Sequence, residues 1–92
     1  YTFVLADAGK ICEFANGSAV TVTVPPNSSV AFPVGTQIEV TQTGAGKVTF
    51  AQGSGVTITS LASYKAIAGQ YASATLYQRA TDTWQLSGSL IA

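Results

Sequence analysis

Apolar and polar residues alternate along much of the chain, and this alternation predicts strands. Residues 20–24 read VTVTV, which places three valines on one face and two threonines on the other. Residues 36–40 read TQIEV and alternate in the same way. Because successive side chains of a strand point to opposite faces of a sheet, a period of two indicates a half-buried strand. Strands are therefore expected at residues 2–5, 11–14, 19–24, 36–43, 48–50, 56–59, 71–78 and 83–86.

Turn-forming residues separate these segments about every 8–12 residues, a spacing typical of small all-β folds. No apolar stripe with a helical period is long enough to predict a helix. We therefore expect one all-β domain over residues 1–92, built as a small β-sandwich, jelly roll or short barrel of about eight strands. The segment Gly44–Lys47 is expected to be a hairpin turn, and residues 60–70 are expected to be irregular. The expected core consists of Phe3, Leu5, Val20, Val22, Val24, Ile38, Val40, Val48, Phe50, Val56, Ile58, Leu76, Trp84 and Leu86.

Charged residues make up only 9% of the 92 residues, whereas about 25% is typical of soluble domains. Threonine, serine, glutamine, glycine and alanine take their place, and short uncharged side chains allow close packing against another surface. The single cysteine, Cys12, cannot form an internal disulfide, and small domains without such a cross-link often gain stability from oligomerisation. These features favour a homo-oligomer. A monomer with an exterior rich in threonine and serine is the alternative.

The charge pattern argues against nucleic-acid binding, and the hydropathy pattern argues against membrane insertion. Four basic residues balance four acidic ones, and Lys10, Lys47, Lys65 and Arg79 are scattered along the chain. Binding to a phosphate backbone requires several basic side chains on one face. No apolar run approaches the roughly 18 residues of a membrane span.

Catalysis is not expected, because the residue types that usually carry it are missing. The sequence contains no histidine, the commonest general base. Cys12 therefore has no histidine partner and is expected to be structural. Asp7 and Asp82 lie in turn contexts, where such side chains commonly cap backbone N–H groups. We expect neither a metal site nor a cofactor.

Four aromatic residues are the candidates for contact with a partner or a ligand: Tyr64, Tyr71, Tyr77 and Trp84. Along residues 71–78, strand alternation places Tyr71 and Tyr77 on the face opposite two alanines and a leucine. An aromatic ring with a polar group serves a subunit interface and a sugar-binding platform equally well. Both interpretations remain open at this point, packing in an interface or core and stacking on a ligand.

Several short motifs occur in an order that resembles a small β-domain of tailed-bacteriophage virion proteins. They are TxxLxDAGK at residues 2–10, TVPxN at 23–27, FPVGTQI at 32–38, GKVTF at 46–50 and DTWxLSG at 82–88. The resemblance covers nearly the whole chain. Such domains occur at the ends of minor tail proteins and tail fibres, and in head-fibre and capsid-decoration proteins. The sequence departs from the pattern mainly at residues 11–14 and 63–66.

The resemblance implies a non-enzymatic structural domain that is exposed on the virion surface and is usually trimeric. Its partners would be copies of itself and other virion proteins, and trimerisation would account for the low charge. The alternative is a carbohydrate-binding or receptor-binding module that contacts host-surface glycan through exposed tyrosine and tryptophan.

Overall fold

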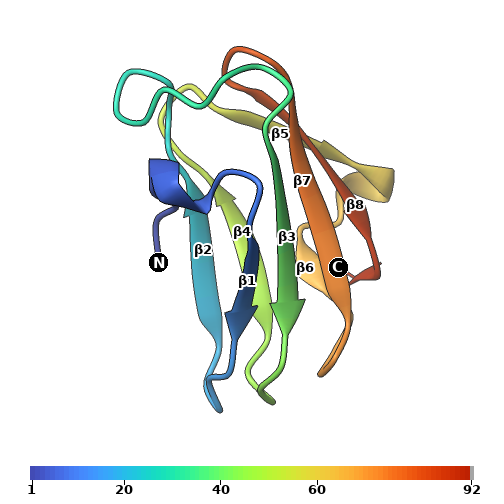
Figure 1. Cartoon of the computed structure of the whole chain (residues 1–92). Coiled ribbons are helices and arrows are strands. Elements are labelled where there is room, and N and C mark those ends of the chain that lie inside the picture. Colours follow the sequence, from blue (N-terminus) through green and yellow to red (C-terminus); the bar gives the residue numbers. More distant parts are fainter. Residues whose placement is uncertain (92) are drawn as a thin grey trace.

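Two mixed β-sheets lie on either side of one apolar core in the computed structural model, which describes residues 1–91 (Figure 1). The five-stranded sheet has the order β1-β3-β7-β8-β5, and the four-stranded sheet has the order β2-β4-β6-β9. Two short 3₁₀ helices, η1 and η2, flank the sheets at opposite sides of the molecule. The bounds are η1 Leu5–Asp7, β1 Ile11–Phe14, β2 Val20–Val24, β3 Gln37–Gln42, β4 Val48–Gln52, β5 Thr57–Ser60, η2 Leu61–Ser63, β6 Ala66–Ile67, β7 Ser73–Ala80, β8 Thr83–Gly88 and β9 Leu90–Ile91.

The first four strands alternate between the two sheets, so that each sheet receives one parallel pair. β1 lies parallel to β3 and β2 lies parallel to β4, and both pairs have the same sequence offset of 28 residues: Ile11 pairs with Glu39, and Val20 pairs with Val48. Parallel neighbours require a crossover connection. Here the connection is a strand of the opposite sheet, so the chain changes sheets after each of β1, β2 and β3.

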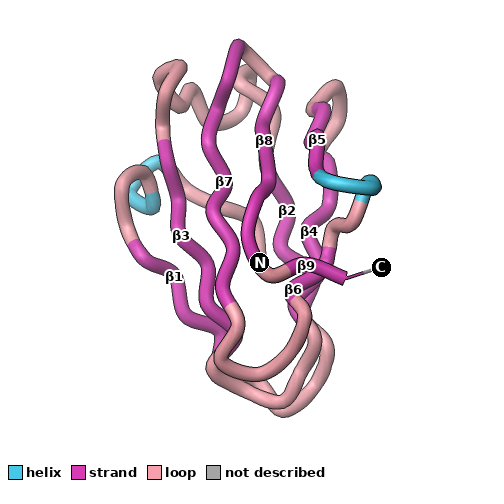
Figure 2. Tube along the Cα trace, turned by 90° about the vertical axis from the view of Figure 1, so that its right-hand side faces the viewer, coloured by secondary structure: helices cyan, strands magenta, loops and turns pink. Residues whose placement is uncertain are grey.

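The turns between β1 and β2 and between β3 and β4 stack on one another at one end of the molecule (Figure 2). The Gly44 N–H donates to the Phe14 carbonyl at 3.0 Å, and the Gly46 N–H donates to the Asn16 carbonyl at 2.9 Å. A Cβ atom at either glycine would collide with the backbone of residues 16–18. The hairpin predicted at Gly44–Lys47 is therefore wrong, because β3 and β4 belong to different sheets.

The core contains most of the residues that alternation predicts. Twelve of the fourteen expected positions are buried, and Val20 is half-buried against the same cluster. Leu5 is the exception, with 55% of its surface exposed, because it begins η1 and does not continue a strand. Four buried hydrophobic residues of the core were not predicted: Phe32, Ala66, Ile67 and Ala74.

Two predicted segments also differ from the structure. Residues 2–5 do not form a strand: Thr2 makes an isolated bridge with Thr23, and the chain then turns into η1. Residues 60–70, expected to be irregular, contain β6, which pairs with Thr49 and with β9. The described chain thus has nine strands where about eight were expected. The last predicted pair is confirmed as the antiparallel strands β7 and β8.

Candidate functional site

Trp84 lies in the core and is unavailable to a ligand or to a second chain. Only 1% of its surface is exposed. Its ring meets Phe32 edge to face, with ring centroids 5.5 Å apart and planes at 89°. Of its two predicted roles, as core residue and as contact aromatic, the structure supports the first.

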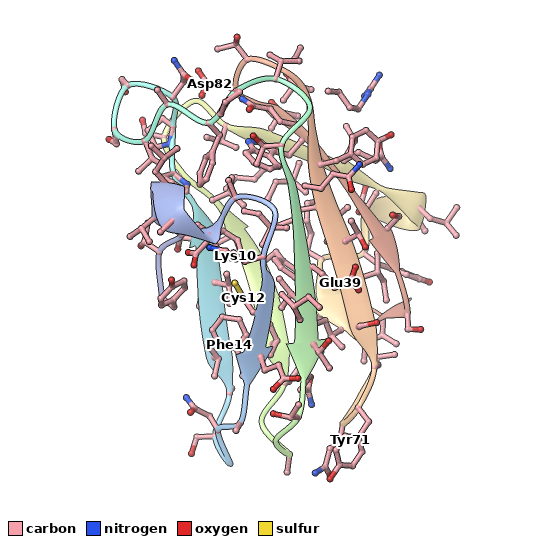
Figure 3. The ribbon with its side chains drawn as sticks, viewed as in Figure 1. Lys10, Cys12, Phe14, Glu39, Tyr71 and Asp82 are labelled. Carbon is pink, nitrogen blue, oxygen red and sulfur yellow. The ribbon has the colours of Figure 1, made fainter. Side chains whose placement is uncertain are left out.

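Tyr71 and Tyr77 are exposed, but they do not form one platform. Tyr77 points outward from β7, where it is paired with Gln37 and Gln85 of the neighbouring strands. Tyr71 precedes β7 and has a φ of 68°, so strand alternation does not set the direction of its side chain. It is 75% exposed and lies at the end of the molecule opposite Asp82 (Figure 3).

Tyr64 lies between two surface hollows, and the structure brings residues to it that the sequence did not indicate. The larger hollow has a volume of about 380 Å³ and is lined by Lys47, Thr49 and residues 62–66. The smaller one has a volume of about 260 Å³ and is lined by Leu61, Tyr64, residues 85–88 and Leu90. Lys47, Thr49 and Lys65 meet at Tyr64 only because β4 and β6 are paired.

A tight turn projects Leu61 from this region. Ala62 and Ser63 both have left-handed backbone conformations, with φ of 54° and 59°. The Tyr64 N–H donates to the Leu61 carbonyl at 3.1 Å, and the Ser60 hydroxyl donates to the Tyr64 carbonyl at 2.6 Å. Non-glycine residues adopt this conformation at a cost in free energy, so it persists where surrounding contacts hold it. These hydrogen bonds help to hold Leu61 outward, with 82% of its surface exposed.

The outer face of the five-stranded sheet is covered mainly by uncharged polar side chains. Successive strands present threonine, serine and glutamine at positions that share this face. Some of these groups are bonded to one another: the Thr75 hydroxyl donates to Glu39 at 2.5 Å, and the Thr59 hydroxyl donates to Gln85 Oε1 at 2.7 Å. The face is thus polar with few charges.

Asp7 organises the N-terminal segment as the predicted backbone cap. Its Oδ2 accepts from the Val4 N–H at 2.9 Å and from the Tyr1 hydroxyl at 2.6 Å. The bond to the carboxylate raises the pKa of Tyr1 to about 12. Cys12 lies near this cluster and is half-buried against the core. Burial, followed by the Asp7 carboxylate, raises the pKa of the Cys12 thiol and disfavours the reactive thiolate.

Asp82 is also a backbone cap, but for a distant loop. Its Oδ1 accepts from the Asn27 N–H at 2.7 Å, which connects the β7–β8 turn to the loop between β2 and β3. Gln78 of β7 also holds this loop. With its amide nitrogen oriented toward the loop, the Gln78 side chain donates to the carbonyls of Phe32 and Pro33, each at 2.9 Å. Both acids that the sequence identified as caps therefore have structural partners.

Other features of residues 1–91 bear on site chemistry. Within these residues, no three histidine, cysteine, aspartate or glutamate side chains are grouped as metal ligands would be.

None of the helices in the described chain is long and apolar enough to cross a membrane. Comparisons with protein-family models, curated proteins and solved structures find no match for this chain.

Proposed function

We propose that the chain is a non-enzymatic structural module on the surface of a bacteriophage virion, in a tail fibre, a minor tail protein or a capsid-decoration protein. It acts through contacts with copies of itself and with other virion proteins. The two sheets form a β-sandwich-type domain, and the working assembly is a trimer.

The observation that carries this proposal is the composition of the outer face of the five-stranded sheet. Hydroxyl and amide side chains cover the five-stranded sheet, and Tyr77 lies among them. Lysine, glutamate, aspartate and arginine normally keep a monomer soluble, and the chain has eight of these residues in all. A polar face with few charges can be buried against protein with a small desolvation cost, because its groups can form hydrogen bonds across the contact.

The first test is the solution mass of the purified chain, measured by light scattering coupled to size exclusion. A mass of three chains is expected. A mass of one chain at every concentration tested would overturn the proposal that it works by self-assembly. Quantitative mass spectrometry of purified particles then separates the locations, since a decoration subunit is present at many copies and a tail tip at few.

The hollow beside Tyr64 favours a second candidate function, binding of a host-surface glycan. Tyr64 offers an aromatic ring, and Thr49 with Lys47 and Lys65 offers polar groups beside it. Sugar sites commonly combine these two kinds of group. On a glycan array, Tyr64→Ala would abolish binding and Tyr71→Ala would leave it unchanged, because Tyr71 lines neither hollow. Absence of binding by the parent chain would remove this candidate.

A further inference from the structure

The turn between β1 and β2 contains an asparagine followed by a glycine, Asn16 and Gly17 (Figure 2). Asparagine is thermally labile, and most so before glycine. The backbone nitrogen of the next residue attacks the side-chain carbonyl, and glycine has no Cβ atom to crowd that approach. The chain has one other asparagine, Asn27, and it is followed by serine. Asn16 is therefore the residue to examine for this chemistry.

The groups that would react at this turn are free. Among residues 1–91, no hydrogen bond involves the Asn16 side-chain amide or the Gly17 N–H. Both residues are exposed. Nothing lies within 4 Å of the position that a Cβ atom on Gly17 would take, so a new ring has room. Asn16 is held through its backbone carbonyl, which accepts from the Gly46 N–H at 2.9 Å.

Asn27 lies in a more constrained setting. It is half-buried in the loop between β2 and β3, and its N–H donates to Asp82 Oδ1 at 2.7 Å. The Pro26 carbonyl accepts from the Ser29 N–H at 2.9 Å, which closes a turn around Asn27. The Cβ atom of Ser28 also crowds the attacking nitrogen. Asn27 therefore serves as the internal reference for a slow site.

We propose that Asn16 is a site of spontaneous deamidation, through which the β1–β2 turn acquires a carboxylate. The Gly17 nitrogen loses its proton to solvent and attacks Asn16 Cγ, and the side-chain nitrogen takes up a proton and leaves as ammonia. The new C–N bond closes a succinimide ring. Water then adds to one of the two ring carbonyls and breaks its C–N bond. The reaction consumes water and releases ammonia, and nothing is oxidised or reduced.

The two products of ring opening differ in the backbone that they leave. Opening between Cγ and the Gly17 nitrogen gives aspartate in the original backbone, so the carbonyl of residue 16 still accepts from Gly46. Opening between the backbone carbonyl carbon and the Gly17 nitrogen gives isoaspartate. The chain then runs through Cβ and Cγ and is one atom longer, and the former backbone carbonyl becomes a side carboxylate.

The stacked turns have no room for the longer backbone. The turn between β3 and β4 lies so close to residues 16–18 that a Cβ atom on Gly44 or Gly46 would collide with them. Extra atoms in a well-packed contact force neighbouring groups to shift, which destabilises the fold. Isoaspartate at position 16 displaces the carbonyl that the Gly46 N–H binds, whereas aspartate leaves it in place. Loss of stability is therefore expected from the isoaspartyl product alone.

The rate of modification tests the site. The full chain is incubated at mildly alkaline pH, and peptide mapping by mass spectrometry follows conversion of each asparagine. Asn16 should react at least about tenfold faster than Asn27, and Gly17→Ala should slow it by a similar factor, because a Cβ atom hinders the attack. That variant should fold like the parent, since Gly17 has no left-handed φ and its Cβ position is open. Equal rates at the two asparagines, or no effect of Gly17→Ala, would contradict the proposal.

Urea denaturation separates the effects of the two products. The formal net charge of the parent chain is zero, so anion exchange isolates the deamidated chains. An isoaspartyl methyltransferase, which labels isoaspartate and not aspartate, identifies the isoaspartyl form. That form should unfold at a lower urea concentration than the parent, and freshly purified Asn16→Asp should unfold close to the parent. An isoaspartyl chain with the parent's midpoint would overturn the effect on the stacked turns. Equal losses in both forms would assign the effect to the new charge and overturn the backbone explanation.

Discussion

Asp7 shows how one carboxylate fixes the start of the fold. It accepts from a backbone N–H and from the Tyr1 hydroxyl, while the aromatic ring of Tyr1 contacts Phe3 and Phe14 edge to face. A local turn residue therefore also positions a ring over two apolar side chains. The hydroxyl and the carboxylate share one proton in this contact, which makes the interaction dependent on pH.

The titration of Tyr1 tests this contact. Its pKa in the folded chain is about 12, raised from the ordinary 10.0, first by the hydrogen bond to Asp7. A raised pKa means that folding favours the protonated hydroxyl. Its contribution to stability is therefore complete below about pH 10 and is lost as the pH rises through about 12. The ultraviolet absorbance of the parent chain minus that of Tyr1→Phe isolates this titration, and Asp7→Asn should lower its midpoint. An unchanged midpoint in Asp7→Asn would contradict the assigned cause.

The reactivity of Cys12 is a second test at this scale. Because burial and the Asp7 carboxylate both raise its pKa, alkylation by iodoacetamide at neutral pH should be slower than at an exposed cysteine. The matched control is a chain in which Cys12→Ser is combined with Ser28→Cys, since Ser28 is exposed. Asp7→Asn should accelerate alkylation of Cys12. Equal rates at the two cysteine positions would show that the thiol is not protected.

At the level of elements, the stacked turns require glycine for a steric reason. Gly44→Ala places a Cβ against the Asn16 carbonyl, so the turn must move away from its neighbour. The expected loss is about 1–3 kcal/mol in the free energy of unfolding, as for overpacked sites. Gly17→Ala is the matched control from the facing turn, because nothing lies within 4 Å of its Cβ position. Urea denaturation measures both, and equal stabilities would contradict close stacking.

The elements also show what the sequence could predict. Strands such as β2 and β3 can be predicted from local alternation, which also predicts which of their faces is buried. The two residues of β6 cannot be predicted in this way, because that strand exists through pairing with Thr49 and Ile91, which are distant in the sequence. The sequence of Gly44–Lys47 fits a hairpin and a turn between sheets equally well, and only packing distinguishes them. Tyr64 was identified as an aromatic candidate, but its neighbours Lys47 and Lys65 are assembled by the fold.

Across the whole molecule, the long loop between β2 and β3 acts as a cover for one end of the core. Phe32 is buried although it lies outside any strand, and it packs on Trp84. Contacts from Asp82 and Gln78 hold the loop backbone in place. The loop therefore belongs to the cooperative unit of the fold, even though its prolines and serines are typical of a surface connection.

Phe32→Ala tests that role against Val34→Ala, which truncates an exposed side chain of the same loop. Removal of Phe32 leaves a cavity beside Trp84, so the free energy of unfolding should fall by about 3–5 kcal/mol. Val34→Ala should change it by less than about 0.5 kcal/mol, as is usual for surface substitutions. Trp84 is the single tryptophan of the chain, so its emission reports this site without interference. In the Phe32 variant alone, this emission should shift to longer wavelength and the Trp84 ring should become accessible to the quencher acrylamide. Equal effects of the two substitutions would mean that the loop does not close the core.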